Sequence, residues 1–120
     1  MSKTKKQVRE AFRNAVFERD KHVCRICGRP GEEGKPLDAH HITDRNIMPN
    51  GGYVKENGIS LCWFHHDLAE LWHRTLGVAH AKDMKPEDLY KLIGSSYEQA
   101  IEASSKEKKS RGYDRTLHKL

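Results

Sequence analysis

The chain has little of what marks a membrane or a secreted protein. No apolar run approaches the roughly 20 residues that a membrane-spanning helix needs, and no charged and apolar leader follows Met1. Its three cysteines are few and odd in number, so a disulfide framework is not expected. We therefore expect a cytoplasmic protein without a membrane contact, whose thiols are available to bind a metal.

Apolar residues are also scarce. Hydrophobic residues make up 36% and charged residues 32% of the 120 residues, which predicts one small domain with a limited core. Domains of this kind are often stapled by a metal ion. Lys and Arg number 22 against 17 Asp and Glu, and the net charge of +5 favours a polyanionic partner such as nucleic acid without establishing one.

The chain up to residue 77 changes from helical to turn-rich to extended patterns. Apolar residues recur at helical spacing from Thr4 to about Lys21, and the outer face of this predicted helix is basic. Residues 23–36 are rich in Gly, Pro and Cys, which is typical of a metal-binding knuckle. The pattern then predicts a strand at 37–42, a wide loop, a second extended segment at 54–61 and a helix at 63–76.

Two further helices are predicted after this β-β-α segment. The first begins near Pro86 and ends at Gly94, and Ser95 with Glu98 forms a capping box that opens the second, through about Ser105. Residues 106–120 are basic without apolar periodicity, and we expect a mobile tail there. The prediction is an α+β fold in a single domain, 1–105, with its core motif at 22–75 flanked by an N-terminal helix and C-terminal helices.

Four residues have the spacing of a structural zinc site. Cys24 and Cys27 are separated by two residues, and Cys62 and His65 repeat this spacing, so each pair can chelate one tetrahedral ion from a single turn. Four protein ligands leave no open position, which assigns this zinc to folding rather than to catalysis. His66 is the neighbour of His65, and an arrangement in which zinc takes His66 instead is the alternative.

Residues between and after these pairs resemble a known family. His40-His41-Ile42, then Asn57, then a Leu-Cys run ending in His66, lie in an order and spacing similar to those of the HNH endonucleases. The resemblance covers about residues 10 to 75. It implies the ββα-metal fold, also called the His-Me finger, and maps the HNH triplet onto His41, Asn57 and His66.

The resemblance also implies a role for each of these residues. His41 would be the general base that activates water, and an unperturbed pKa near 6.5 suits histidine to that task. His40 and His66 would hold one divalent cation, while Asn57 would orient the strand that carries the base. The implied products of phosphodiester hydrolysis carry 5′-phosphate and 3′-hydroxyl ends.

The implied catalytic site departs from the family in one ligand. Family members often have a carboxylate where this chain has His40, and imidazole suits Mn²⁺, Ni²⁺ or Co²⁺ at least as well as Mg²⁺. Glu70 and His73 lie on nearly the same face of the predicted helix as His66, so either is a further candidate ligand. Adjacent residues of a regular strand point to opposite faces, so His40 and His41 serve one site only if the strand ends or twists there.

The function expected from these observations is a metal-dependent DNA endonuclease of a phage or restriction type, either nicking or cutting both strands. A noncatalytic zinc-dependent module that binds nucleic acid is the alternative, and a nuclease toxin is a third. The partners expected besides DNA are a second copy of the chain, in a homodimer, or a phage packaging or restriction protein. The candidate phosphate contacts are the cations of the C-terminal tail and basic residues of the first helix, the loop and the central helix: Lys3, Lys5, Lys6, Arg9, Arg13, Arg45 and Arg74.

Overall fold

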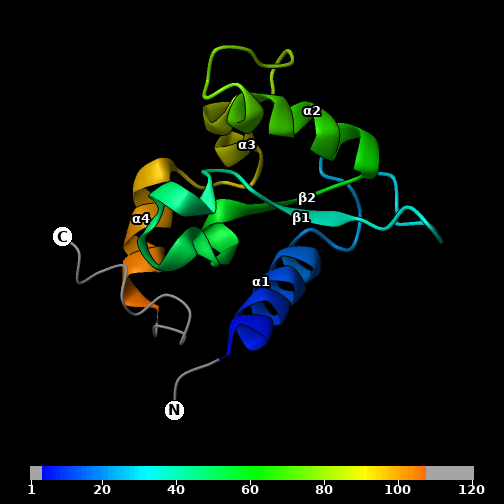
Figure 1. Ribbon diagram of the computed structural model, residues 1–120. Coiled ribbons are helices and arrows are strands. Elements are labelled where there is room, and N and C mark those ends of the chain that lie inside the picture. The colour runs from blue at the N-terminus through cyan, green and yellow to red at the C-terminus, as the bar shows by residue number, and fades with distance from the viewer. Residues whose placement is uncertain (1–3, 108–120) are drawn as a thin grey trace.

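A computed structural model describes residues 4–107 (Figure 1). At its centre is an antiparallel hairpin of β1, Asp38–His41, and β2, Gly58–Leu61. Helix α1, Lys5–Arg19, packs on one side of the hairpin, and α2, Trp63–Arg74, follows directly from β2 and packs on the other. This is an α+β fold consistent with the expected ββα core. Among the described residues, no helix is both long and apolar enough to cross a membrane.

Helix α1 begins and ends at well-defined caps. The side chain of Thr4 accepts a hydrogen bond from the backbone of Gln7 at 3.1 Å, and the side chain of Gln7 accepts one from the backbone of Thr4 at 2.9 Å. Phe12 and Val16, four residues apart, are buried against the hairpin. The predicted helix is therefore confirmed, and its apolar face is the one that contacts the strands.

The end of α1 is held by a buried carboxylate. Asp20 is 2% exposed and accepts hydrogen bonds from Arg19 Nε at 2.7 Å and Arg25 Nη1 at 2.8 Å. It also accepts a hydrogen bond from the backbone nitrogen of Ser60, in β2, at 2.8 Å. Because two guanidinium groups and a strand amide share this carboxylate, Asp20 joins α1, the cysteine-containing loop and the hairpin.

The second extended segment predicted from the sequence is only half correct. Residues 58–61 form β2, but Lys55–Asn57 form a short 3₁₀ helix, η3. The wide loop before it also folds into 3₁₀ turns, η1 at Arg45–Ile47 and η2 at Pro49–Gly52. These turns draw the loop back over the hairpin and bring Gly52 next to Asn57, whose side chain donates a hydrogen bond to the Gly52 carbonyl at 3.2 Å.

The two C-terminal helices are present and pack against the loop and the core. Helix α3 spans Pro86–Leu92 and α4 spans Tyr97–Lys106. The expected cap at Ser95 is wrong, because the side chain of Ser96 caps α4 and Ser95 Oγ donates a hydrogen bond to the carbonyl of Glu56. The expected mobile tail lies almost entirely outside the described residues.

The main core lies where the hairpin, α2, α3 and α4 meet. Its fully buried members include Ile42, Ile59, Leu61, Leu89 and Ala100. A smaller cluster of Phe12, Val16 and Tyr53 lies on the α1 side. Burying each large side chain contributes about 1.5–3 kcal/mol, so a core of this size gives the domain only a modest free energy of unfolding.

Candidate active site and metal centres

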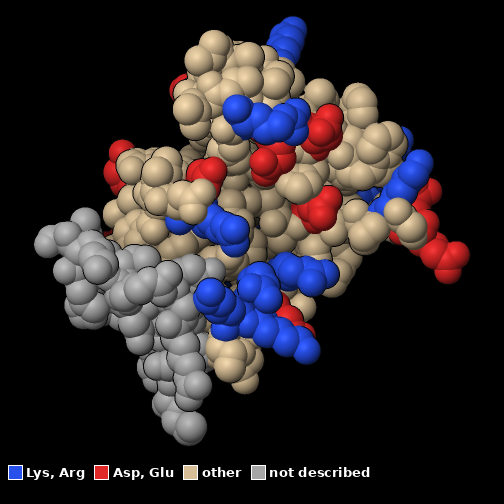
Figure 2. Space-filling view, viewed as in Figure 1, with Lys and Arg blue, Asp and Glu red and all other residues tan. Residues whose placement is uncertain are grey.

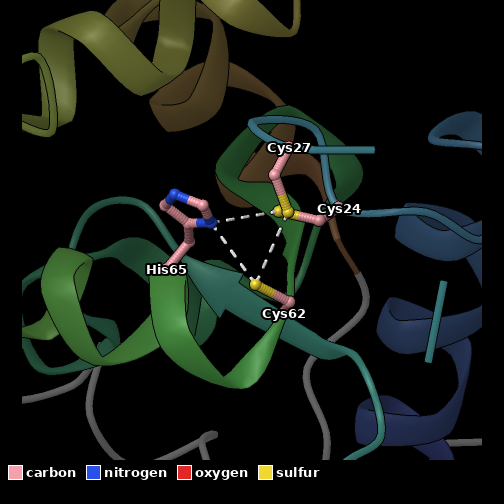
Figure 3. A group of neighbouring side chains, drawn as sticks. All are labelled: Cys24, Cys27, Cys62 and His65. Atoms are coloured by element: carbon pink, nitrogen blue, oxygen red, sulfur yellow. Dashed lines mark hydrogen bonds between the residues drawn. The ribbon is translucent and has the colours of Figure 1, made fainter. Parts of the chain in front are cut away.

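Three cysteines and one histidine converge beside the hairpin (Figure 3). Cys24 and Cys27 come from the loop after α1, Cys62 is the N-cap residue of α2, and His65 lies in its first turn. Their ligand atoms all lie within 4.8 Å of one another. The structure thus brings the four residues of the Cys-Cys-Cys-His pattern to one point.

The spacing of these atoms fits a tetrahedral zinc ion. Sγ of Cys27 and Sγ of Cys62 are 3.8 Å apart, and Nδ1 of His65 lies 3.3 Å from Cys62 Sγ and 3.8 Å from Cys24 Sγ. Zinc–sulfur bonds of about 2.3 Å at tetrahedral angles give sulfur–sulfur edges of about 3.8 Å. The cluster therefore fits a zinc knuckle without any rearrangement.

The ionisation of Cys24 and His65 agrees with that fit, whereas burial raises the pKa of Cys27. Burial raises the pKa of Cys24, but backbone hydrogen bonds from Cys27, Cys62 and Ile26 outweigh it, and the net shift lowers the pKa of this thiol. Burial lowers the pKa of His65, which keeps the imidazole neutral. A thiolate and a neutral imidazole are the forms that bind zinc.

His65 and His66 point to different groups. His65 Nδ1 lies among the sulfur atoms, whereas His66 Nδ1 lies 3.0 Å from Oδ2 of Asp38, at the start of β1. The other ring nitrogen of His66, Nε2, is 3.4 Å from Oε2 of Glu70. The geometry thus favours the assignment with His65 at the knuckle and leaves His66 on the other side of α2.

A second group of metal donors lies between β1 and α2. His40, Glu70 and His73 offer ligand atoms within 4.8 Å of one another, and Oε2 of Glu70 is 3.1 Å from Nδ1 of His40. The direction between these two atoms is not that of a hydrogen bond, so Nδ1 of His40 is buried without a hydrogen-bond partner among the described residues. A buried nitrogen lone pair beside a carboxylate oxygen fits a cation better than an empty interior.

The electrostatics of this group favour a charged Glu70. The neighbouring His40, and then His66, hold the pKa of the Glu70 carboxyl far below its usual range. Burial lowers the pKa of His40, while the interaction with Glu70, aided by the charge of Asp38, raises that of His66. A neutral imidazole and an ionised carboxylate are both competent metal ligands.

In both His73 and His66, the ring nitrogen that would not bind metal contacts another residue, and this contact fixes the orientation of the ring. Nε2 of His73 lies 2.9 Å from the carbonyl oxygen of His41, which can only accept, so Nε2 carries the proton and Nδ1 keeps its lone pair. In the same way, Nδ1 of His66 faces the carboxylate of Asp38 and leaves Nε2 toward Glu70. Such second contacts fix ring orientation at metal centres.

His41 sits between two aromatic side chains. Its ring is stacked on Phe12 of α1, with centroids 4.5 Å apart, and meets the edge of Tyr53 at 4.6 Å. Burial, and then the neighbouring His40, lower the pKa of His41 to about 4. Its Nε2 atom is buried without a hydrogen-bond partner among the described residues, so this nitrogen is free to accept a proton.

Asn57 is fully buried and uses all of its side-chain hydrogen-bonding capacity. Oδ1 accepts from the Thr43 backbone nitrogen at 2.9 Å and from the Tyr90 hydroxyl at 2.8 Å. Nδ2 donates to the carbonyls of Thr43, at 3.1 Å, and Gly52, at 3.2 Å. Asn57 thus holds both backbone groups of the residue two positions after His41.

These groups share one open cleft of about 490 Å³. His40 and His41 both line it, because β1 ends at His41 and the chain turns away there. His66, Glu70 and His73 of α2 form one wall, and residues of α1 form another. The cleft therefore combines a proton acceptor with a set of metal donors.

Comparison with known families agrees with this geometry. Residues 24–67 match the family model of the HNH endonucleases. The match spans the cysteine knuckle, the hairpin and the first turns of α2. Members of that family are nucleases that act on DNA, so the domain indicates a nuclease or nucleic-acid-binding role. Comparison with curated proteins and with solved structures gave no match.

The candidate site contains several contacts that the sequence did not indicate. Phe12 and Tyr90, which touch His41 and Asn57, lie outside the matched segment, and their spacing indicated only helix faces that pack on a core. The sequence also gave no indication of the contact between His66 and Asp38, the first residue of β1. Glu70 was a candidate through its helical spacing from His66, and the structure places it at the centre of the donor group.

Proposed function

We propose that the protein is a metal-dependent DNA endonuclease that hydrolyses phosphodiester bonds to 5′-phosphate and 3′-hydroxyl ends. One observation carries this proposal: His41, whose Nε2 is buried without a hydrogen-bond partner among the described residues, lines the same cleft as the donor group of His40, Glu70 and His73 and the neighbouring His66. Hydrolysis of a phosphodiester requires a proton acceptor for the attacking water and positive charge beside the phosphate. The cleft offers both at once.

In the proposed reaction, His41 removes a proton from the attacking water. Its lowered pKa, about 4, keeps the ring neutral and able to accept a proton at neutral pH. Phe12 and Tyr53 restrict the ring on two sides, so Nε2 is presented in one orientation. Asn57 fixes the backbone of Thr43 and thereby the end of the strand that carries the base. The HNH triplet of His41, Asn57 and His66 thus divides into a base, a positioning residue and a ligand.

The residues that would hold the catalytic cation are His40, Glu70 and His73, together with His66, whose Nε2 lies 3.4 Å from Oε2 of Glu70. When bound, a divalent ion supplies positive charge that stabilises the phosphate oxygens and the departing 3′ oxygen in the transition state. Imidazole nitrogens outnumber carboxylate oxygens in this set, which suits Mn²⁺, Ni²⁺ or Co²⁺ at least as well as Mg²⁺. The ion at Cys24, Cys27, Cys62 and His65 is proposed to be zinc, with a structural role only.

The experiment that tests this function is relaxation of supercoiled plasmid by the zinc-loaded protein. We expect open circles to form with added Mn²⁺, Ni²⁺, Co²⁺ or Mg²⁺ and not without a divalent ion, and the product ends to accept ligase directly. Open circles should precede linear DNA, because the described residues form one such cleft per chain. If cutting depends on Mg²⁺ alone, the proposed metal preference is wrong. If plasmid stays supercoiled with every metal, the alternative of a noncatalytic zinc-dependent nucleic-acid-binding module replaces the nuclease.

A further inference from the structure

Helix α1 forms a wall of the cleft, although it lies before the segment that matches the HNH family. The cleft is lined, opposite the metal donors of α2, by Arg9, Phe12 and Arg13 of α1. The matched segment therefore does not account for the whole cleft. The role of the wall formed by α1 depends on how rigidly this helix packs and on what Arg9 and Arg13 contact.

The position of α1 relative to His41 is fixed by packing. Phe12 is 3% exposed and stacks directly on the His41 ring, and Gly58 opposite His41 in β2 leaves room for Phe12 and Val16. At the other end of the helix, Arg19 donates a hydrogen bond to the carbonyl of Gly58 at 2.6 Å. Side chains that flank Phe12 are thus held at a defined place beside the base.

Arg9 and Arg13 flank Phe12 on the exposed side of α1. They are four residues apart, which places them one turn and about 6 Å from each other along the helix axis. Both are exposed, and neither forms an ion pair with a carboxylate of residues 4–107. The contact seen for Arg13 is with an aromatic ring, its guanidinium lying 6.0 Å from the centre of Phe17.

The α1 side of the molecule carries a group of basic side chains. Figure 2 shows Lys and Arg gathered over α1 with an acidic side chain among them, while Asp and Glu lie together with some Lys and Arg over the region of α2 on the same face. Glu70 on the α2 side belongs to the proposed cation site, whereas Arg9 and Arg13 on the α1 side form no ion pair with a carboxylate of residues 4–107. A planar guanidinium binds a phosphate through two parallel hydrogen bonds, which makes it the side chain best suited to a polyanion.

We propose that Arg9 and Arg13 bind backbone phosphates of the DNA strand held in the cleft, so that α1 is the substrate-positioning wall of this site. The inference rests on the proposed function. It goes beyond it by separating these two residues from the other cations of the same helix. Lys5 and Lys6 lie in the first turn of α1 and do not line the cleft. The same helix therefore offers a control with equal charge.

The test compares two double variants, Arg9→Ala with Arg13→Ala and Lys5→Ala with Lys6→Ala, in the full-length zinc-loaded protein. Binding of a fluorescent DNA duplex is measured by anisotropy across a range of salt concentrations, without added divalent ion. Each phosphate contact contributes about 0.9 to the slope of log K against log salt. We expect the arginine pair to raise Kd at least tenfold and to reduce the slope by about 2, and the lysine pair to change Kd less than threefold.

Thermal unfolding of both variants is the control for folding, and we expect parental transitions because all four side chains are at exposed helix positions. Equal losses from the two pairs would overturn the inference, because net charge alone would then explain binding. No change from the arginine pair would overturn it as well. If the protein cuts no DNA but the arginine double variant still binds DNA more weakly, the nuclease proposal fails and this inference stands. If the protein cuts DNA and the arginine double variant binds DNA normally, the nuclease proposal stands and this inference fails.

Discussion

The hydroxyl of Tyr90 donates a hydrogen bond to Oδ1 of Asn57 across 2.8 Å in the interior of the protein. Because the Tyr90 hydroxyl donates its proton to Asn57, the hydroxyl of Thr43, 2.6 Å away, donates its own proton to the Tyr90 oxygen. Burial raises the pKa of Tyr90 to about 12, which keeps the phenol protonated as a donor. Helix α3, which lies beyond the matched HNH segment, thus reaches the residue that positions the end of β1.

Removing this hydroxyl by Tyr90→Phe is expected to lower kcat about tenfold and to leave KM for DNA within twofold. The reason is that Asn57 loses one of its two fixed donors, which loosens the backbone that carries His41 without touching the DNA-binding surface. The free energy of unfolding should fall by about 1–2 kcal/mol, the cost of leaving buried polar partners unsatisfied. Steady-state plasmid relaxation and urea unfolding measure the two effects.

Tyr97→Phe is the matched control, because Tyr97 carries the same hydroxyl at a position 48% exposed at the start of α4. Its kcat and stability should equal those of the parent. A Tyr90→Phe protein with parental kcat would show that Tyr90 supports the fold alone.

Gly58 permits the close approach of α1 to the hairpin. A Cβ atom at this position would lie 2.5 Å from Cγ2 of Val16 and 2.6 Å from Cε1 of Phe12, so Gly58→Ala must displace both side chains. Overpacking of this kind costs about 1–3 kcal/mol, and the displaced Phe12 no longer restrains His41. We expect lower stability together with slower cleavage at saturating DNA, measured by thermal unfolding and plasmid relaxation.

Gly94→Ala separates steric displacement from the general cost of replacing a glycine. Gly94 has a φ of +68°, and a Cβ there would meet open space, so the substitution costs about 1 kcal/mol of backbone strain far from the cleft. Cleavage by this variant should match the parent. Normal cleavage by Gly58→Ala would contradict the proposed restraint of His41 by Phe12.

The two metal centres should respond differently to substitution. Cys27→Ser removes one ligand of the knuckle, so we expect less than one zinc per chain by elemental analysis and loss of cooperative unfolding, since structural zinc contributes directly to folding. Glu70→Ala should keep one zinc per chain and a normal unfolding transition while cleavage falls at least a hundredfold. If Glu70→Ala also loses its zinc, the two centres are not independent.

Local patterns in the sequence predicted most of the fold. The helices α1, α2 and α3 follow from apolar spacing, α4 follows from a serine capping signal, and the knuckle follows from the spacing of Cys24, Cys27, Cys62 and His65. The 3₁₀ turn at residues 55–57 was predicted as extended, because these polar residues lie between Val54 and the apolar residues of β2, although Asn57-Gly58 breaks the segment. The cap at Ser96 was missed by one residue, since two adjacent serines offer the same local signal and a tertiary contact to Glu56 decides between them.

The candidate site was predictable only where its residues are close in sequence or share a motif. His40, His41, Asn57 and His66 were found in this way, and the structure brings all four to one region. Phe12 and Tyr90 could not be found, because each reaches the site through packing between segments more than 25 residues apart. A single sequence holds no local signal for contacts at that separation.

The central claim is that His41 is the general base of a nuclease whose two metal centres are separate. Its most direct test is single-turnover cleavage of plasmid by His41→Ala at saturating Mn²⁺, beside measured zinc content and thermal unfolding. Loss of a general base costs about 10²–10⁴-fold in rate. The account predicts a loss of at least a hundredfold with one zinc per chain and a normal unfolding transition. A folded, zinc-loaded His41→Ala protein that cuts as fast as the parent would contradict it.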